Sequence, residues 1–515
     1  MTEYRSKVPF YGFPDAIDEQ EAALDSHPMM ERLARSREFL ASHRHRPLYH
    51  YVNPEGTLND PNGLCRWQGR WHLFYQAYPP EDPRQHWGHA VSDDLIHWRD
   101  LPYCIYPDPE ERCFSGATLV EDDRVIAMYH GTKVGNMVAV ANDPMLLNWT
   151  KLTGGPVIPM AEPGDPPLPY PVFDPCVWKQ GDSYYALSGG RIPEGPGNAP
   201  VAADYLFRSR DLEHWEYLHP FTEGDRLTLV GDDGACPYFW PIGDKHMLLF
   251  FSHMSGGQYL VGDYDTDRQK LVVTDGGKFN MGPALPNGVH APSATPDGRD
   301  IVVIFNMNAS KRGVAGWNQI MSLPRRLSLG EDGGLLQEPV EAVASCRRSR
   351  QGGGPLSLPA NSEVVLEGLG GDALEIQASI APSKAAMVEL NVLRSPNREE
   401  FTRIAFYRDR GYRDVALRKR HVESLVTLDT SYSTTAPDVL SRAPETARVL
   451  VGPDEALELR VFVDRSIVEV FVNGRQCVAA RVYPDRADSR GLSFRSQGTA
   501  SEVTRLDVWE MGSIY

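Results

Sequence analysis

The sequence has few cysteines, and none belongs to a recognisable ligand or disulfide motif. The seven cysteines are scattered over 515 residues, and no CxxC pair occurs. Structural zinc sites and disulfide frameworks rest on closely spaced or paired cysteines. We therefore expect free, mostly buried thiols. His86 and His89 in "HWGH" come nearest to a pair of metal ligands, but no third ligand accompanies them, so we expect no metal site.

Long hydrophobic runs and excess positive charge are also missing. No apolar run approaches the roughly 18 residues that a membrane span needs. The opening segment "MTEYRSKVPF" lacks the apolar centre of a secretory signal. With 52 basic and 69 acidic side chains, the net charge of −17 argues against binding to nucleic-acid phosphates. We expect a cytoplasmic protein with a neutral partner such as a sugar, and no membrane or nucleic-acid partner; secretion of a processed form and the oligomeric state stay open.

The length and the hydrophobic content indicate at least two folded domains. Hydrophobic residues make up 41% of the 515 residues, enough for packed cores. Near the start, "MMERLARSREFLASH" (residues 29–43) places Met30, Leu33, Arg37 and Leu40 at helical spacing. This pattern predicts one amphipathic helix in an N-terminal extension, residues 1–47, that packs on the outside of the main body.

A repeated pattern from residue 48 onward predicts a β-propeller. "AVSDDLIHW", "AVANDPMLLNW" and "LFRSRDLEHW" each run from a strand through a polar turn with Asp to a Leu and a Trp. Several short strands per unit, repeated about every 50 to 65 residues, are typical of propeller blades. We expect Trp98, Trp149 and Trp215 to pack between blades, and the propeller to span residues 48–340.

A second all-β domain is predicted after a Gly/Pro/Ser-rich stretch. "SCRRSRQGGGPLSLPANSE" reads as a linker or a domain boundary. Beyond it, "LRVFVDRSIVEVFVNGRQCVAARVY" alternates over two long runs, with Asn473-Gly474 where a tight hairpin belongs. Residues 355–515 therefore predict an antiparallel β-sandwich. The predicted fold class is all-β: a propeller followed by a sandwich, with a short helical N-terminal extension.

One short stretch, "TLNDPNGL" (residues 57–64), concentrates turn-forming residues around a single carboxylate. Asn, Asp, Pro and Gly favour turns, and Pro has no N–H to give to a sheet. The composition predicts that the chain leaves a strand sharply here, with Asp60 in the turn. In isolation this is equally typical of an ordinary surface turn.

Further motifs along the chain, taken together with this stretch, resemble those of a known protein family. In chain order the sequence contains "NDPNGL", "HLFYQAYPP", "HWGHAVSDDLIHW", "CFSGATLV", "VFDPCVW", "ACPYFW" and "LRVFVDRSIVEVFVNG". Together these resemble glycoside hydrolase family 32, the invertases, inulinases and levanases, from about residue 48 to the C-terminus. The resemblance implies a five-bladed propeller joined to a sandwich, an active site in the central funnel, and no metal or organic cofactor.

The resemblance also implies a retaining cleavage of β-fructofuranosides. Such a reaction needs a carboxylate nucleophile and a proton donor beside the leaving oxygen. Asp60 matches the nucleophile of the family. Asp174 in "VFDPCVW" matches the Asp that binds sugar hydroxyls and strengthens its hold in the transition state. The family usually has Arg before this Asp, whereas this chain has Phe173, which offers only an apolar face.

The larger departure lies in "VGDDGACPYFW", where the family places its acid/base Glu directly before the Cys and this chain has Ala235. Three interpretations stay open. Asp233, or the adjacent Asp232, acts as the acid, since two close carboxylates tend to raise one pKa. Alternatively the protein is a weak or inactive fructan binder, or the chain carries an engineered Glu-to-Ala change. "GDDG" is also typical of a plain surface turn.

The remaining positions carried over from the family are substrate-binding candidates: Asn59, Gln76, Trp87, Phe114 and Ser115, with Asp232 beside them. Sugar sites combine an apolar wall with a few polar groups, although each of these residues also suits ordinary packing. The expected function is hydrolysis of sucrose, fructo-oligosaccharides, inulin or levan through a fructosyl-enzyme intermediate. A fructan-binding protein without turnover and a fructosyltransferase are the alternatives, while linkage, chain length and exo or endo action stay open.

Overall fold

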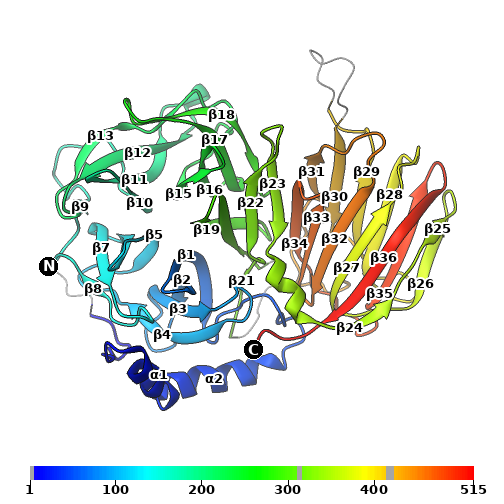
Figure 1. Cartoon of the computed structure of the whole chain (residues 1–515), viewed down its shortest axis with the longest axis horizontal. Coiled ribbons are helices and arrows are strands. Elements are labelled where there is room, and N and C mark those ends of the chain that lie inside the picture. The colour runs from blue at the N-terminus through cyan, green and yellow to red at the C-terminus, as the bar shows by residue number, and fades with distance from the viewer. Residues whose placement is uncertain (1–4, 310–315, 413–422) are drawn as a thin grey trace.

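The chain forms a ring of five β-sheets and a two-sheet sandwich that lie side by side (Figure 1). The computed structural model describes residues 5–309, 316–412 and 423–515. This confirms the predicted all-β fold of a propeller followed by a sandwich, and the ring has the five blades that the family resemblance implied. None of the helices in these described ranges is long and apolar enough to cross a membrane.

The first three blades each run outward from an inner strand at the ring centre. Blade 1 is β1 (Thr57–Trp67), β2 (Arg70–Tyr78), β3 (His86–Ser92) and β4 (Arg99–Ile105). Blade 2 is β5 (Cys113–Val120), β6 (Val125–Gly131), β7 (Gly135–Ala141) and β8 (Thr150–Lys151), with β9 (Ile158–Pro159) also on β7. Blade 3 is β10 (Pro175–Gln180), β11 (Ser183–Ile192), β12 (Val201–Ser209) and β13 (Glu216–Pro220).

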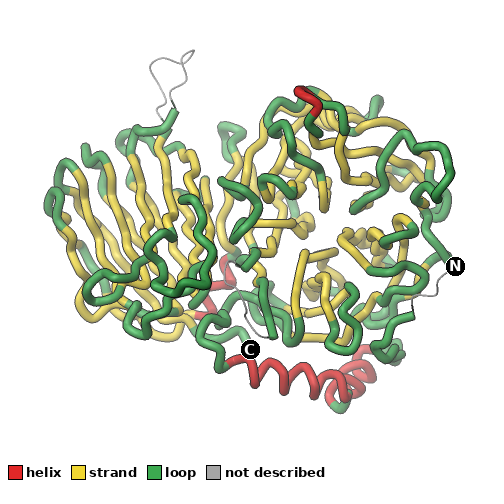
Figure 2. Tube along the Cα trace, turned by 180° about the vertical axis from the view of Figure 1, so that it is seen from behind, coloured by secondary structure: helices red, strands yellow, loops and turns green. Residues whose placement is uncertain are grey.

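The last two blades complete the ring. Blade 4 is β15 (Ala235–Ile242), β16 (Lys245–Ser252), β17 (Gly256–Asp265) and β18 (Lys270–Lys278), and β14 (Thr222–Glu223) lies parallel to β18. Blade 5 is β19 (Val289–Asp297), β20 (Asp300–Met307), β22 (Arg325–Leu329) and β23 (Leu335–Pro339), with β21 (Ile320–Met321) on β20. The inner strands β1, β5, β10, β15 and β19 contact one another in turn around the axis, as Figure 2 shows from behind.

Tryptophans seal the gaps between neighbouring blades, as the repeat predicted. Trp149 of blade 2 packs edge-on against Phe74 of blade 1, with ring centroids 5.5 Å apart. Trp98 joins a core that contains blade 5 side chains, and Trp215 packs against one built from blades 2 and 3. A blade alone leaves an apolar face uncovered, so burial of these large side chains stabilises the closed ring.

The sandwich buries aliphatic side chains between two antiparallel sheets. One sheet has the order β24 (Arg347–Gly352), β36 (Ser501–Met511), β27 (Ala373–Ile380), β32 (Leu457–Asp464), β33 (Ile467–Val472), β34 (Gln476–Arg481), with β25 (Leu356–Leu358) on β36. The other has the order β26 (Glu363–Gly370), β35 (Gly491–Gln497), β28 (Met387–Arg394), β29 (Thr402–Tyr407), β30 (Ser424–Asp429), β31 (Glu445–Val449). The predicted Asn473-Gly474 hairpin connects β33 to β34, and both residues have positive φ.

Two local predictions need revision. The Gly/Pro/Ser-rich stretch that was expected to be a linker or a domain boundary does lie where the sandwich begins, but it is not a linker, because it contributes β24 and β25, which both pair with β36 at the edge of the sandwich. Short edge strands tolerate Gly and Pro, which explains the misleading composition. The N-terminal segment has two helices rather than one, α1 (Ile17–Asp25) and α2 (Pro28–Ala41).

The N-terminal helices lie along the outside of the propeller (Figure 1). Leu33 of α2 is buried in a core shared with blade 1. Arg37 of α2 makes a two-pronged ion pair with Asp100 on β4, with both nitrogen–oxygen distances 2.7 Å. Short 3₁₀ turns occur at Pro196–Asn198 and Glu341–Cys346.

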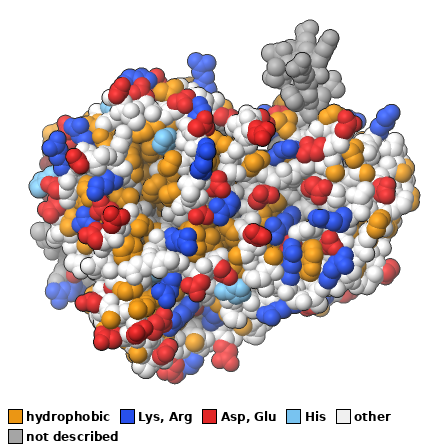
Figure 3. Space-filling model, in the orientation of Figure 1, with side chains coloured by type: hydrophobic (Ala, Val, Ile, Leu, Met, Phe, Trp, Pro, Cys, Tyr) orange, Lys and Arg blue, Asp and Glu red, His pale blue; other side chains and the backbone are white. Residues whose placement is uncertain are grey.

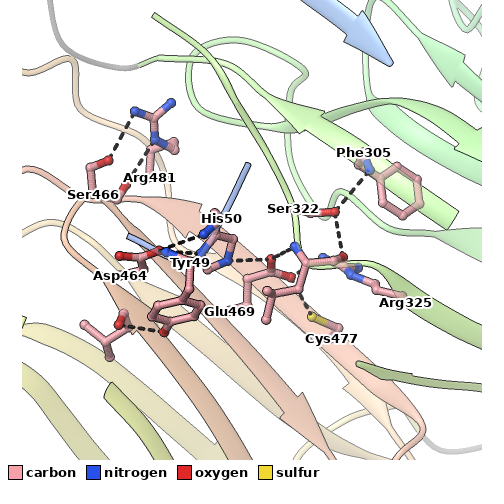
Figure 4. A network of polar contacts seen from close by, with 12 residues as sticks. Tyr49, His50, Phe305, Ser322, Arg325, Asp464, Ser466, Glu469, Cys477 and Arg481 are labelled. Atoms are coloured by element: carbon pink, nitrogen blue, oxygen red, sulfur yellow. Dashed lines mark hydrogen bonds and ion pairs between the residues drawn. The ribbon is translucent and has the colours of Figure 1, made fainter. Parts of the chain in front are cut away.

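A buried polar network joins the propeller to the sandwich (Figure 4). The carboxylate of Glu469 on β33 accepts hydrogen bonds from Arg325 Nη2 on β22 at 2.8 Å, from the backbone N of Leu323 at 2.7 Å and from His50 Nε2 at 3.2 Å. His50 Nδ1 lies 2.9 Å from Asp464 Oδ2. All four charged side chains are fully buried. Because such charges are costly without their partners, the network fixes how the two domains meet.

On the face shown in Figure 3, acidic and basic side chains are interspersed over both domains, and hydrophobic side chains gather over the propeller half. A groove of about 900 Å³ separates blades 4 and 5 from the sandwich, and Tyr259, Leu336, Arg448 and Gln476 are among the residues that line it.

Candidate active site

Asp60 lies within the innermost strand of blade 1 and not in a turn. The strand β1 continues through the whole stretch 57–67, and its pairing with β2 is interrupted between Leu58 and Pro61 and again between Asn62 and Cys65. The predicted sharp exit from a strand is therefore wrong. Residues that favour turns also favour β-bulges, and Pro is tolerated where a strand faces no partner. The two irregularities kink β1 at the ring centre beside Asp60.

Backbone N–H groups of β1 form hydrogen bonds with side chains from other blades. Gly63 N donates to the Tyr238 hydroxyl of β15 at 3.1 Å, and Leu64 N donates to Ser293 Oγ of β19 at 2.8 Å. Tyr238 Oη also donates to the Gly116 carbonyl of β5 at 2.9 Å. Gly63 has a φ of +48°, and a Cβ there would lie 2.6 Å from the Thr118 side chain. The axis is thus closed on one side of Asp60 by hydrogen bonds between blades.

Hydrogen bonds from other strands hold the Asp60 carboxylate. Ser115 Oγ of β5 donates to Asp60 Oδ2 at 2.7 Å, and Gln76 Nε2 of β2 reaches the same oxygen at 3.3 Å. Gln76 Nε2 also donates to Ser115 Oγ at 2.6 Å. Asn306 Nδ2 of β20 donates to Asp60 Oδ1 at 3.3 Å. Side chains of blades 1, 2 and 5 therefore orient one carboxylate at the axis.

Asp174, from blade 3, joins the same cluster through Cys236 of blade 4. The Cys236 Sγ atom lies 3.7 Å from Asp60 Oδ2 and 3.5 Å from Asp174 Oδ2, and Cys236 N donates to Asp174 Oδ2 at 3.2 Å. Cys236 has a φ of +50°, at an interruption of the β15–β16 pairing. This bulge aims both its N–H and its thiol at the carboxylates. We call the group Asp60, Asp174, Cys236 and Ser115 the axial cluster.

Burial raises the cost of ionising both axial carboxylates, and the charge of Asp60 adds to the cost at Asp174. Burial, followed by the negative charge of Asp60, raises the pKa of Asp174 to about 7, against the hydrogen bonds from Cys236. Burial also raises the pKa of Asp60, while the hydrogen bond from Ser115 and the charge of His253 oppose the shift. Perturbed carboxyl pairs of this kind are typical of catalytic sites.

Sequence reasoning missed two amides that hold Asn59, the residue before Asp60 on β1. Asn306 Nδ2 donates to Gln319 Oε1 at 2.7 Å, and Gln319 Nε2 donates to Asn59 Oδ1 at 3.0 Å. Asn59 Nδ2 in turn donates to Gln76 Oε1 at 3.2 Å. Asn306 is the first polar residue after the apolar run "IVVIF", and this signal at a strand end was available in the sequence.

The structure places the two candidate replacements for the missing Glu differently. Ala235 begins β15, next to Cys236. Asp233 Oδ2 lies 2.7 Å from His253 Nδ1, and its Oδ1 accepts from His253 N at 2.8 Å. Asp232 is fully buried and accepts from Ser255 Oγ at 2.6 Å and from Leu229 N at 2.7 Å, so it holds its own loop.

The expected raised pKa is absent from this pair of aspartates. Burial alone would raise the pKa of Asp233, but the hydrogen bonds and the charge of His253 outweigh it and lower the pKa. Burial is likewise outweighed at Asp232, where hydrogen bonds from Ser255 and its neighbours lower the pKa. The prediction that one of the two has a raised pKa is therefore wrong, because each carboxylate has its own donors.

Among the aromatic candidates, Trp87 is not at the surface of the cluster. Its side chain is fully buried, and its Nε1 donates to the Phe114 carbonyl at 3.0 Å. Phe114 is partly exposed and its ring lies 6.2 Å from that of His130, which lies 6.1 Å from the ring of Phe173. Phe173 precedes Asp174 and is 46% exposed. The exposed apolar surface beside the carboxylates thus comes from Phe173 and Phe114.

Comparison with known proteins gives a consistent assignment. A family model described as Glycosyl hydrolases family 32 N-terminal domain matches residues 50–339, and one described as Glycosyl hydrolases family 32 C terminal matches residues 343–510. The chain is 28% identical to the levanase of Bacillus subtilis, over 92% of this chain and 71% of the levanase. It is 28% identical to the sucrose-6-phosphate hydrolase of Escherichia coli, over 90% of this chain and 95% of that protein.

A solved structure shares the fold of this chain. The crystal structure of fructan 1-exohydrolase IIa from Cichorium intybus superposes with a TM-score of 0.79 at 21% identity, covering 92% of this chain and 98% of that one. At this identity the likeness concerns the fold alone. Because the two family matches together span most of the residues of the propeller and the sandwich, the chain belongs to glycosyl hydrolases family 32 and is a glycosidase.

Proposed function

We propose that the protein hydrolyses β-fructofuranosidic bonds with retention, using Asp60 as the nucleophile and Asp174 as the stabiliser of the transition state. The observation that carries this proposal is the shared contact of both carboxylates with Cys236 Sγ, at 3.7 and 3.5 Å. Carboxylates from two blades therefore face one small volume at the ring axis. Retaining hydrolysis needs a carboxylate that can attack the anomeric carbon from one side of the sugar ring.

Asp60 suits the role of nucleophile because its carboxylate is oriented before substrate arrives. Hydrogen bonds from Ser115, Gln76 and Asn306 fix both oxygens. A preoriented nucleophile lowers the entropic part of the barrier. Asp174 suits the second role because a carboxylate can accept hydrogen bonds from sugar hydroxyls, and these strengthen as positive charge develops on the fructosyl ring.

The substrate class follows from the relatives. The curated relatives include a levanase, a sucrose-6-phosphate hydrolase and an acid beta-fructofuranosidase of Vicia faba. A solved structure of the Cichorium intybus exohydrolase is a complex with 1-kestose. We infer a fructose-containing oligo- or polysaccharide as the substrate. Asn59, Gln76 and Ser115 offer polar groups, and Phe114 and Phe173 offer an apolar wall.

A second function, binding of fructans without turnover, is favoured by one observation. Ala235 supplies no proton at the position where the family pattern has a carboxyl group. Transfer of the fructosyl group to a sugar acceptor is the same chemistry with water replaced, and it is a further outcome of the assay below.

The test is release of fructose from sucrose, 1-kestose, inulin and levan by the purified protein. Wild type should release fructose from at least one of them, and Asp60→Asn should abolish release. Asp263→Asn is the matched control, because that exposed carboxylate lies on β17 and pairs with Lys245, and the variant should keep full activity. Binding of these sugars by wild type with no product would favour the second function.

A further inference from the structure

The β15–β16 pairing brings a second titratable pair, Asp233 and His253, near residue 235. Ala235 is the register partner of Phe251. Continued by two residues along both chains, this antiparallel register sets residue 233 beside residue 253. The ring of His253 lies 4.8 Å from that of Phe251, and Phe251 belongs to the same buried cluster as Ala235. Asp233 and His253 are therefore near position 235, where the family pattern has a carboxyl group.

Asp233 holds His253 by two contacts. Asp233 Oδ2 lies 2.7 Å from the ring Nδ1, and Oδ1 accepts from the His253 backbone N at 2.8 Å. The His253 side chain is 73% exposed, whereas that of Asp233 is 22% exposed. Because Nδ1 is the nitrogen that faces Asp233, Nε2 on the other side of the ring is directed away from it. The arrangement fixes the ring and leaves it accessible to a ligand.

This pair borders the axial cluster. The positive charge of His253 acts on Asp60 and on Asp174, and their charges act on His253. Asp233 is three residues before Cys236, whose thiol contacts both axial carboxylates. The His253 ring thus lies within electrostatic range of the two groups to which the hydrolysis is assigned.

We propose that His253 is the general acid and base of the hydrolysis, and that Asp233 is its positioning residue. This inference rests on the proposed function. It replaces the hypothesis that Asp233 is itself the acid.

The charges around the ring support a proton on His253. The hydrogen bond to Asp233 raises the pKa of His253, partial burial opposes the shift, and the negative charges of Asp233, Asp174 and Asp60 add to it. His290 is another titratable side chain near this place, and its ring lies 4.0 Å from that of Phe251. Burial lowers the pKa of His290 to about 3, so it is neutral and does not compete for the proton.

The proposed reaction has two steps. An Asp60 oxygen attacks the anomeric carbon of the fructosyl unit, the bond to the leaving oxygen breaks, and that oxygen takes the electron pair together with a proton from His253 Nε2. The products are an Asp60 fructosyl ester, the released alcohol and a neutral imidazole. Water then attacks the same carbon and gives a proton to Nε2, while the ester bond breaks and Asp60 is restored.

Asp204 is the competing candidate and serves as the comparison. A Cβ on Gly234 would lie 3.4 Å from Asp204 Oδ1, so this carboxyl also lies near position 235. Burial, with the charge of Asp225 second, raises its pKa to about 8, which would keep a proton available. However, Asp204 is only 4% exposed, and the charge that acts on it is that of Asp225 rather than an axial carboxylate.

The experiment compares two substrates in the purified full-length protein. 1-Kestose has a sugar leaving group that needs a proton, whereas β-fructofuranosyl fluoride leaves as fluoride and needs none. For His253→Gln we expect kcat/KM on 1-kestose to fall by about 10²- to 10⁴-fold, while first-turnover fluoride release stays within about fivefold of wild type. Azide, which attacks without a base, should restore steady turnover of the fluoride. Asp204→Asn should show no such difference between the substrates.

Asp233→Asn tests the positioning role by a pH profile. Loss of the carboxylate should move the alkaline limb of kcat/KM on 1-kestose to lower pH, because the imidazolium loses its main stabilising partner. Equal losses of His253→Gln on both substrates, or no loss on either, would overturn the proposal, as would a selective loss in Asp204→Asn. These outcomes leave wild-type fructose release intact, so they are distinct from failure of the proposed function, in which wild type itself releases no fructose.

Discussion

Replacing Ser115 by alanine tests how the fold tunes its nucleophile. The Ser115 hydroxyl donates to Asp60 Oδ2 at 2.7 Å, and Ser115 as a residue is 2% exposed. Water therefore does not readily take its place. Burial raises the pKa of Asp60, and the hydrogen bond from Ser115 is the largest of the effects that oppose this rise. Without the hydroxyl, the ionised form of Asp60 loses stabilisation and its pKa should rise further.

A hydrogen bond to a charged group contributes about 1.5–3 kcal/mol, and one pKa unit corresponds to about 1.4 kcal/mol. Ser115→Ala should therefore move the acidic limb of kcat/KM upward by about one to two pH units. Because only the ionised nucleophile reacts, activity on the acidic side should fall about 10- to 100-fold and recover at higher pH. Since the charge of Asp60 acts on Asp174, the apparent pKa read from this acidic limb belongs to the two carboxylates together.

The assay is fructose release from the preferred substrate at a series of pH values. Ser115→Thr keeps a hydroxyl, so the acidic limb of its kcat/KM profile should coincide with that of wild type. Ser322→Ala is the control for general loss of a buried hydroxyl, because the Ser322 hydroxyl bonds to the backbone of Phe305 and Leu323 in blade 5. It should change stability and leave the limb unmoved. An acidic limb in Ser115→Ala that coincides with that of wild type would refute the reasoning.

Two further predictions concern buried charge. Glu469→Gln leaves Arg325 and His50 without their shared carboxylate, and it should lower the unfolding free energy by about 3–5 kcal/mol. Glu31→Gln removes the charge from an exposed pair with Arg35 and should lower it by under about 1 kcal/mol. Similar denaturant midpoints for the two variants would contradict this. Asp174→Asn should abolish activity yet raise stability more at pH 8 than at pH 5. The folded pKa of Asp174 is about 7, above the unfolded value near 3.9, so wild type loses stability as pH rises between them. Equal changes in melting temperature at the two pH values would count against that assignment.

The features that the sequence predicted well are those with a local physical signal. The Trp repeat marks blades because each blade must cover its neighbour, and Trp149 indeed packs against Phe74. Asn473-Gly474 adopts positive φ at both residues in its hairpin. The same local logic failed at residues 57–64, because the residues that favour turns also favour the bulges that kink β1.

Residues of the site could be predicted from the sequence only where they lie in a recognisable motif. Asp60 and Asp174 stand in recognisable stretches, but the contacts that unite them depend on closure of the ring. Asn306 and His253 each follow an apolar strand, and no short-range pattern connects them to residues some 20 to 250 positions earlier. Trp87 shows the converse, because a motif position that suggested a sugar-facing wall is fully buried between blades.

The assignment of Asp60 as the nucleophile is tested most directly by trapping the covalent intermediate. Wild-type protein is mixed with β-fructofuranosyl fluoride, quenched with acid during turnover, digested and analysed by peptide mass spectrometry. We predict one fructosyl unit attached at Asp60, and no such peptide from Asp60→Asn. A fructosyl unit on any other residue, or undiminished fructose release by Asp60→Asn, would contradict the account.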